Sequence, residues 1–555
     1  MSDMKVFEVM AQAFVAEGVD THFALMGNAN MYWSSLLAQK HGVRTIHARH
    51  EHCACAMASG YSRATGKIGV ASVTCGPGFT QIMTELACAV RASTPLVIFA
   101  GDTELSRSWS IHELDLGPLA VATGAHYVPM RHIDRVLECV REAFHVARFE
   151  RRPVVLGVPM DLQQEPFPYL PDYKPSTTLG PTPQRAQPDP ELVDQVVAMI
   201  ASASRPIIIA GRGAMYSGAG APLEALAGEC GALLATSLLA KGMFDSNPFA
   251  IGIAGAFAGN LAREQFAESD LVIGAGVGLG HYTTEGGYLY PNARVVQIDT
   301  HPRGLWQGLR VADLHIRADA RATVEAILAK LRERRIARPG VRTPALAQRI
   351  ANEVVDSKEF PVEPNTVDPR KALLELDRVV PKDWDIVVGN GHFTNFVLTH
   401  MRGRAPERWH VVTHFGAIGS GLPSAIGVAI SRGDGKVLLI EGDGSVLMHI
   451  QELETIRRHG VRLLTCVLND GAYGAEAHKF RAHGLDASEA IHGRGDLAAV
   501  ANGFGLRGVT VNSLGRFETL LREHQQGGGA ELWDVHIDAE IPSAQYRRIH
   551  FGDVS

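Results

Sequence analysis

The sequence predicts an α/β protein with three domains, each a mostly parallel β-sheet flanked by helices. Short runs of β-branched residues and leucine, each followed by glycine, recur along the chain: TPLVIFAGD (94–102), RPIIIAGRGA (205–214), SDLVIGAGVG (269–278), WDIVVGNG (384–391) and GKVLLIEGDG (435–444). Such a run is typical of a buried parallel strand that enters its loop. Segments with helical periodicity lie between the runs, at residues 4–17, 222–231, 323–335 and 450–459. This alternation favours parallel sheets covered by helices.

Two stretches rich in proline divide the chain. Residues 163–190 are crowded with proline and lack periodicity, and residues 336–368 form a weaker break. We therefore expect domains at 1–165, 191–340 and 369–555, joined by linkers at 166–190 and 341–368. Each domain has an ordinary size. The first and third share one plan, in which a strand leads through a glycine-rich turn into a helix.

Composition excludes several classes of protein. Hydrophobic residues make up 46% of the 555 residues and charged residues 20%, the balance of a soluble globular chain rather than a disordered one. The net charge of −6 gives no sign of nucleic-acid binding. The N-terminus lacks a signal-peptide pattern and the apolar runs are too short to cross a bilayer, so we expect a cytoplasmic protein without a membrane partner. The seven cysteines form no CxxC pair, and we expect free, mostly buried thiols.

The segment 442–474 predicts a phosphate and metal site. A buried run leads into the turn GDG (442–444), a helical segment follows, and a second buried run ends in NDG (469–471). Glycines let the backbone approach a phosphate, and a helix N-terminus supplies N–H donors. Asp443 and Asp470 follow neighbouring strands and so face one crevice. Two carboxylates, a backbone carbonyl and phosphate oxygens together make an octahedral Mg²⁺ site.

On these residues the chain resembles the thiamine diphosphate (ThDP) enzymes, whose motif is GDG followed, one helix and one strand later, by Asn-Asn or Asn-Asp. The resemblance covers nearly the whole chain, and its general likeness is to the group of acetolactate synthase, pyruvate decarboxylase, benzoylformate decarboxylase and benzaldehyde lyase. It implies a pyrimidine-binding, a central and a diphosphate-binding domain, in that order. It also implies a homodimer or homotetramer in which two chains share each active site.

The same resemblance assigns the metal and cofactor ligands. Asp443 and Asp470 are the expected Mg²⁺ ligands, with the carbonyl group of Ala472 as a third; most members of the family have Asn at the position of Asp470. The other residues of this domain expected to contact the cofactor are Asn390, Gly391, His392, Gly442, Gly444, Ser445 and Tyr473.

A second signature lies in residues 42–81, which resemble the pyrimidine-domain motif of the family. Glu51 falls at the end of a strand, where family members carry the glutamate that hydrogen-bonds the pyrimidine ring and activates the cofactor. A hydrogen-bonded carboxyl group in a dry pocket suits this proton transfer. Gly76 and Pro77, in a turn that follows in the family order, are expected to contact the cofactor.

The histidines beside Glu51 do not predict a metal site. Alternation along a strand does not bring His47, His50 and His52 to one centre. Cys53 and Cys55 are interpreted as helix packing.

Residues 413–430 (THFGAIGSGLPSAIGVAI) resemble the family segment that bends the cofactor into a V shape. The resemblance makes Ile418 the apolar wedge below the bend. The carbonyl oxygen of Gly416 is expected to accept a hydrogen bond from the amino group of the pyrimidine.

Three polar residues are expected to face the substrate as catalytic groups. Asn28 lies in the loop LMGNANMYW, His112 lies in SIHELD, and Glu476 lies in the segment after Asp470. A His–Glu pair above the cofactor can move protons to and from the substrate. Weaker candidates for the same rim are His392, His414, His478 and Lys479.

Departures from acetolactate synthase leave the substrate open. Pro159-Met160-Asp161 stands where those enzymes usually have Pro-Lys-Asp, and residues 474–484 lack their Trp. The stretch GVGLGHYTTEGG (276–287) replaces the one that accompanies FAD. The central domain therefore holds FAD, ADP or neither, and its glycines are too loosely spaced for a dinucleotide fingerprint.

We therefore expect a ThDP- and Mg²⁺-dependent enzyme that cleaves or forms a C–C bond next to a carbonyl, an acetolactate-synthase-like 2-oxo acid decarboxylase or carboligase. Its substrate is then a small 2-oxo acid, an aldehyde or an acyl-CoA. The alternative is a ThDP-dependent lyase, resembling benzaldehyde lyase, that acts on a 2-hydroxyacyl-CoA or an acyloin. A third hypothesis, an inactive homologue serving as a binding subunit, predicts loss of the activating glutamate or of the metal ligands, and Glu51, Asp443 and Asp470 are all present.

Overall fold

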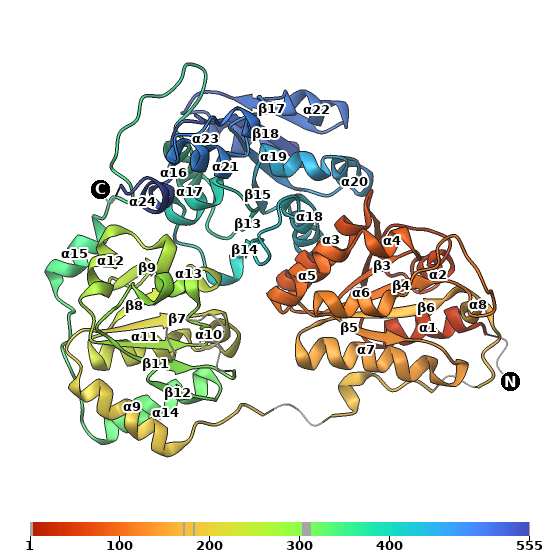
Figure 1. Cartoon of the computed structure of the whole chain (residues 1–555), viewed down its shortest axis with the longest axis horizontal. Helices are drawn as coiled ribbons and strands as arrows, with labels where there is room; N and C mark the ends of the chain where they lie inside the picture. Colours follow the sequence, from red (N-terminus) through yellow and green to blue (C-terminus); the bar gives the residue numbers. More distant parts are fainter. Residues whose placement is uncertain (1–3, 170–171, 181–183, 302–311, 554–555) are drawn as a thin grey trace.

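Three six-stranded parallel sheets organise the chain. The computed structural model describes residues 4–169, 172–180, 184–301 and 312–553. Figure 1 shows the first sheet and its helices in red and orange, the central unit in yellow and green, and the third in teal and blue. Every pairing between neighbouring strands is parallel. The predicted fold class is confirmed.

The first sheet has the strand order β2-β1-β3-β4-β6-β5. Its strands are β1 (Thr21–Ala24), β2 (Arg44–His47), β3 (Gly69–Val73), β4 (Leu96–Asp102), β5 (His126–Pro129) and β6 (Pro153–Pro159). Its helices are α1 (Val6–Ala16), α2 (Met31–Gln39), α3 (Glu51–Thr65), α4 (Pro77–Thr80), α5 (Met83–Ala92), α6 (Leu116–Thr123), α7 (Val136–Glu150) and α8 (Met160–Gln164). Strand β4 is the buried run predicted at 94–102.

The central sheet has the order β12-β11-β10-β7-β8-β9. Its strands are β7 (Pro206–Ala210), β8 (Leu233–Thr236), β9 (Ala250–Ile253), β10 (Leu271–Ala275), β11 (Arg294–Ile298) and β12 (Leu314–Ile316). Its helices are α9 (Pro190–Ser202), α10 (Arg212–Ser217), α11 (Gly220–Cys230), α12 (Asn260–Ala267), α13 (His281–Thr284) and α14 (Ala320–Glu333). A further helix, α15 (Pro344–Ala351), lies in the segment expected to be a linker, where Leu346 and Ile350 pack with the apolar side chains of this domain.

The third sheet has the order β14-β13-β15-β16-β18-β17, which repeats the first sheet strand for strand. Its strands are β13 (Asp385–Val388), β14 (Trp409–Val411), β15 (Val437–Gly442), β16 (Leu464–Asn469), β17 (Arg507–Val511) and β18 (Glu531–His536). Its helices are α16 (Pro369–Val379), α17 (Phe393–His400), α18 (Gly421–Arg432), α19 (Asp443–Val446), α20 (Glu452–His459), α21 (Gly474–Ala482), α22 (Leu497–Gly503), α23 (Phe517–Gly527) and α24 (Ala544–His550). The shared plan of the first and third domains is confirmed.

Helices α3 and α18 join the first and third domains. A Cβ atom on Gly60 would stand 2.1 Å from the carbonyl oxygen of Ser424, and one on Gly427 would stand 2.0 Å from the carbonyl oxygen of Met57. Glycine at both positions lets the two helix backbones approach this closely. One apolar cluster runs through both helices and both sheets, so the two domains share a core.

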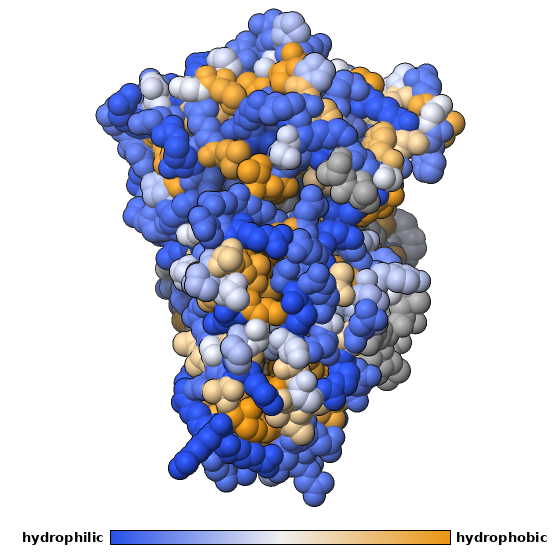
Figure 2. Space-filling model, turned by 90° about the vertical axis from the view of Figure 1, so that its left-hand side faces the viewer, coloured by the Kyte–Doolittle hydropathy of each residue, from blue (hydrophilic) through white to orange (hydrophobic). Residues whose placement is uncertain are grey.

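The surface agrees with the balanced composition. The left-hand side of the molecule in Figure 1 faces the viewer in Figure 2, where hydrophobic residues form scattered groups on a mostly hydrophilic face. Among the described residues, no helix combines the length and apolar character needed to cross a membrane. All seven cysteines are free and buried, which confirms that prediction.

Candidate active site

Strands β15 and β16 place two aspartates in one crevice. The strands pair in parallel with Gly442 opposite Leu468, so the residues that follow them leave the sheet at the same edge. Asp443 begins helix α19, and Asp470 follows β16 directly. The N–H of Gly471 donates a hydrogen bond to Oδ2 of Asp443 at 3.1 Å. The predicted convergence of the two strand ends is confirmed.

Burial shifts the ionisation of both carboxyl groups. Asp443 is only 3% exposed, and burial raises its pKa to about 6. Burial, together with the negative charge of Asp443, raises the pKa of Asp470 to about 7. A bound cation relieves the repulsion between two such carboxylates, and oxygen donors suit Mg²⁺. The donor set therefore fits the metal that the resemblance implies.

A cavity of about 150 Å³ opens beside the two aspartates. It is lined by Asn390, Gly391, His392, Phe393, Gly416, Ile418, Gly442, Asp443, Gly444, Ser445, Leu468, Asp470, Ala472, Tyr473, Gly474, Ala475 and Glu476. The structure thus brings together all the predicted cofactor and metal residues of the C-terminal domain, and Glu476 with them.

Glycines shape the wall of this cavity. A Cβ atom on Gly442 would stand 2.9 Å from the ring of Phe393, and one on Gly444 would stand 3.0 Å from the ring of Tyr473. Side chains at these positions would crowd the crevice. The glycines keep the crevice at the N-terminus of α19 free of side chains, which lets a phosphate group approach the backbone.

The segment predicted to bend the cofactor lines the same cavity. Ile418 is half-buried there. The carbonyl oxygen of Gly416 accepts a hydrogen bond from Nδ2 of Asn390 at 2.7 Å, and its second lone pair can still serve a ligand. The N–H of Gly419 donates to Oγ of Ser445 at 2.8 Å. This bond ties the segment to the helix after the GDG turn.

A wall of aromatic rings stands beside the cavity. The rings of His392 and His478 lie 4.4 Å apart, and Tyr546 on helix α24 lies 4.7 Å from His392. Nε2 of His392 accepts the N–H of Ser543 at 3.0 Å, which fixes α24 against the site. Burial, together with the charge of Glu476, raises the pKa of Tyr546 to about 12. Burial lowers the pKa of His478 to about 4, so this ring is neutral at pH 7.

Two residues of this region carry no sequence signal. Tyr546 lies on the C-terminal helix, outside every motif. Nε2 of His492 lies 3.7 Å from Oδ2 of Asp443, beside the candidate metal position. Both belong to segments that only the fold brings to the crevice, so sequence reasoning missed them.

The predicted residues of the first domain form a second group. Strand β2 ends at His47 and helix α3 begins at Glu51, so Glu51 occupies a helix N-terminus rather than the strand end itself. A Cβ atom on Gly78 would stand 3.5 Å from Oε1 of Glu51. One on Gly76 would stand 2.8 Å from the carbonyl oxygen of His112. The glycine turn therefore connects Glu51 with His112.

Asn28 joins this group through Thr74. Cβ atoms on Gly27 and on Gly78 would stand 2.6 Å and 2.8 Å from the Thr74 side chain. Both Asn28 and His112 are exposed. The lining of the cavity at Asp443 is drawn entirely from residues 390–476, all in the third domain.

The glycine-rich turns of the central domain pack against each other. A Cβ atom on Gly211 would stand 2.3 Å from the carbonyl oxygen of Gly276, and one on Gly213 would stand 2.8 Å from its Cα atom. Close packing between the ends of β7 and β10 therefore explains these glycines. The expectation that this domain holds FAD, ADP or neither stays as the sequence leaves it.

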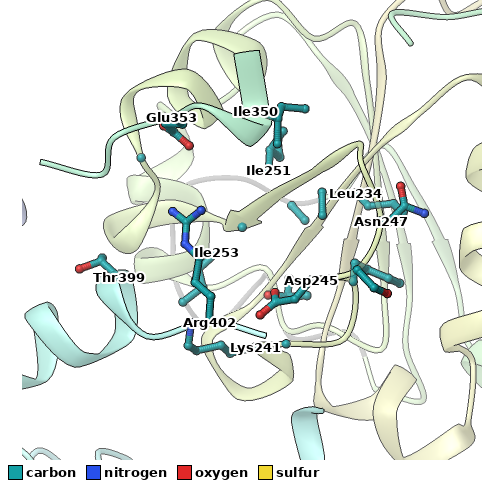
Figure 3. A pocket seen from close by; sticks show the side chains of 18 of the residues that line it. Leu234, Lys241, Asp245, Asn247, Ile251, Ile253, Ile350, Glu353, Thr399 and Arg402 are labelled. Atoms are coloured by element: carbon teal, nitrogen blue, oxygen red, sulfur yellow. The ribbon is translucent and has the colours of Figure 1, made fainter. Parts of the chain in front are cut away.

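A separate cavity of about 320 Å³ lies between the central domain and the end of helix α17 (Figure 3). Lys241, Asp245 and Arg402 gather at one end, and Ile350 and Glu353 lie at the other. Burial, partly offset by the charge of Asp245, lowers the pKa of Lys241 to about 8. None of the residues that line this cavity belongs to the predicted active site.

Known proteins match the chain along most of its length. The thiamine pyrophosphate enzyme family matches in three parts: the N-terminal TPP binding domain at residues 4–117, the central domain at 193–327 and the C-terminal TPP binding domain at 389–535. The chain is 29% identical to an acetolactate synthase large subunit of Parasynechococcus marenigrum, over 95% of this chain and 86% of that protein. It is 28% identical to a probable acetolactate synthase large subunit of Methanococcus aeolicus, over 96% of this chain and 92% of that protein. A probable chloroplastic acetolactate synthase 2 of Oryza sativa subsp. japonica is 28% identical to the chain, over 98% of this chain and 85% of that protein.

Proposed function

The chain belongs to the thiamine pyrophosphate enzyme family, and on this premise we propose that it is a ThDP- and Mg²⁺-dependent 2-oxo acid decarboxylase or carboligase. The observation that carries the proposal is the pair of neighbouring carboxyl groups with raised pKa, Asp443 and Asp470, beside a cavity walled by glycine. The relatives named acetolactate synthase support carboligation. The substrate is then a small 2-oxo acid, with a second carbonyl compound as acceptor.

Residues of the C-terminal domain bind the cofactor in this proposal. Asp443, Asp470 and the carbonyl group of Ala472 hold Mg²⁺, and the N-terminus of α19 receives the diphosphate. Ile418 fills the space beneath the bent cofactor and orients it. When bound, ThDP supplies a carbon nucleophile that adds to a carbonyl and accepts the electron pair released as a C–C bond breaks.

Residues of both the first and the third domain move protons. Glu51 holds a proton at its carboxyl oxygen and exchanges it with the pyrimidine ring of the cofactor. His112 and Glu476 exchange protons with the oxygen of the substrate, and Asn28 orients that oxygen by a hydrogen bond. Glu476 is exposed beside Lys479, whose Nζ lies 3.7 Å away, so this carboxylate can rotate toward a ligand.

We infer that two chains share each site. The cavity at Asp443 is lined by residues 390–476, whereas Glu51 and His112 are grouped in the first domain. A homodimer or homotetramer in which the first domain of one chain covers the cavity of another would complete both sites at once. The partners in this proposal are thus a small molecule and copies of the same chain, in the cytoplasm.

The test is release of CO₂ by the purified protein with ThDP and Mg²⁺. A panel of 2-oxo acids is supplied with and without an aldehyde acceptor, and the products are identified by mass. Release of CO₂ together with a ligated product supports the carboligase. If the protein binds ThDP and releases no CO₂, the proposal fails, and cleavage of a 2-hydroxyacyl-CoA or an acyloin would indicate the lyase instead.

A further inference from the structure

Three metal-ligating side chains meet where the first and third domains join. His50 caps helix α3, Cys53 lies in its first turn, and His449 ends the short 3₁₀ turn η8 (Leu447–His449). The ligand atoms of the three side chains all lie within 4.8 Å of one another. Figure 1 shows α3 beside α18 and α20 at this junction. Sequence reasoning considered only His47, His50 and His52, and it missed this group because His449 belongs to another domain.

Each imidazole has a nitrogen lone pair that a metal can use. Nδ1 of His449 is buried and, within the described part of the chain, has no hydrogen-bond partner; the residue is 8% exposed. Nδ1 of His50 accepts the N–H of His52 at 3.1 Å, so this nitrogen is unprotonated. Coordination would exchange that hydrogen bond for a metal bond. At His449 it would satisfy a nitrogen whose burial without a partner is unfavourable.

The neighbours of the group hold its side chains in place, and one of them, Glu452, brings a carboxyl group close to Cys53. The ring of His52 stacks on that of His449 at 4.8 Å, and Nε2 of His52 lies 2.9 Å from Oγ of Ser420. Burial and the nearby charge of Glu452 raise the pKa of the Cys53 thiol well above its usual range. The thiol therefore keeps its proton until a metal displaces it, and Glu452 adds negative charge next to the site.

We propose that His50, Cys53 and His449 bind a thiophilic divalent cation of the Zn²⁺ class, with release of the thiol proton. Two imidazole nitrogens and one thiolate are a typical donor set for zinc, and a fourth position stays open to water. Bond lengths of about 2.0 Å to nitrogen and about 2.3 Å to sulfur bring tetrahedral ligand atoms roughly 3.5 Å apart. Small rotations of the three side chains therefore close the site.

The bound cation joins the first domain to the C-terminal domain next to Glu51. Its nitrogen and sulfur donors distinguish it from the oxygen donors of Asp443 and Asp470. Because the cation binds the folded junction and not the unfolded chain, it raises the melting temperature of the protein.

Titration of the metal-free, full-length protein with Co²⁺ and then Zn²⁺ tests the site. Co²⁺ bound to a thiolate gives an intense near-ultraviolet charge-transfer band, which oxygen ligands do not give. We expect this band to saturate at one equivalent of Co²⁺ and to disappear when Zn²⁺ displaces it. Cys53→Ser should abolish the band, and His449→Gln should weaken Co²⁺ binding at least tenfold. Cys55→Ser, at a second buried cysteine of helix α3, should retain the band.

Two results would overturn the proposal: no band in the wild type, or a band of equal affinity in Cys53→Ser. Circular dichroism shows whether each variant folds. If Cys53→Ser does not fold, Co²⁺ binding by His449→Gln tests the site instead. Asp443→Asn removes a ligand of the proposed Mg²⁺ site and should keep the band. Failure of the zinc site is thereby separated from failure of the proposed function.

Discussion

Gly471 donates its N–H to Oδ2 of Asp443 at 3.1 Å, which ties the loop after β16 to the start of the helix after β15. This hydrogen bond keeps Asp470 beside Asp443, close enough for the charge of Asp443 to contribute to the raised pKa of Asp470. Two carboxyl groups in this arrangement favour a bound cation. The proposed function depends on that preference, and on a glutamate in another domain.

Replacement of Glu51 tests whether the proposed function depends on this glutamate. Glu51→Gln keeps the size of the side chain but cannot exchange a proton at pH 7. We expect kcat/KM to fall by about 10²–10⁴-fold, with the circular dichroism spectrum unchanged. Glu138→Gln, at an exposed position on α7, is the matched control and should keep full activity. Near wild-type turnover in Glu51→Gln would remove this residue from the mechanism.

The contribution of Asp470 to the stability of the metal-free protein should fall as the pH rises. Burial and the charge of Asp443 raise the pKa of Asp470 from 3.8 to about 7, so the folded state binds this proton more tightly than the unfolded state does. This contribution is therefore lost between about pH 4 and pH 7 as the proton leaves. Asp470→Asn keeps an oxygen that can accept the N–H of Ala472, and it removes the charge. At pH 8 the metal-free variant should melt a few degrees above the wild type.

Thermal melts at pH 5 and pH 8, with and without Mg²⁺ and ThDP, check this prediction. Mg²⁺ and ThDP should stabilise the wild type more than Asp470→Asn at pH 8. Glu489→Gln, at an exposed glutamate of the same domain, should match the wild type in every condition. Equal melting temperatures for Asp470→Asn and the wild type in metal-free buffer at pH 8 would contradict the raised pKa.

Removal of the apolar wedge should slow the reaction. Ile418 lines the cofactor cavity, and Ile418→Ala leaves space beneath the bent cofactor. We expect kcat to fall roughly tenfold or more, because the reacting groups are held less well. The measurement is kcat at saturating ThDP, so that weaker binding of the cofactor does not affect the measured rate. Val500→Ala on helix α22 is the control, and an unchanged kcat in Ile418→Ala would argue against the wedge.

The wall formed by the C-terminal helix should control substrate size. Tyr546 lies 4.7 Å from His392, which lines the cavity. Tyr546→Ala should raise kcat/KM for bulky 2-oxo acids relative to pyruvate by about tenfold. Tyr546→Phe keeps the ring and should leave this ratio unchanged. A panel of 2-oxo acids of increasing size measures the ratio, and the same preference in all three proteins would place Tyr546 outside the substrate pocket.

The sequence predicts the sheets because each buried parallel strand is a local signal. The run at 435–444 becomes β15, and the turn after it carries Asp443 to the crevice, since strand and turn are contiguous in the chain. Helix α15 was not predicted, because its single apolar pair, Leu346 and Ile350, is too short a pattern among prolines.

Contacts between distant segments could not be predicted. Tyr546 reaches His392 because Ser543 is hydrogen-bonded to the same ring, and no local pattern reports this. His449 reaches His50 and Cys53 because glycines let α3 and α18 pack closely and carry two domains together. The spacing of residues along one strand does not predict which residue of another sheet will contact them.

Mixing two inactive variants tests the shared site most directly. Chains carrying Glu51→Gln and chains carrying Asp443→Asn are unfolded together, refolded at equal concentration and assayed with the substrate found in the panel. If two chains share each site, random pairing restores about a quarter of wild-type activity, because half of the dimers are mixed and one of their two sites is intact. Activity no greater than that of the two variants assayed separately would show that Glu51 and Asp443 of the same chain act together, and would contradict the account.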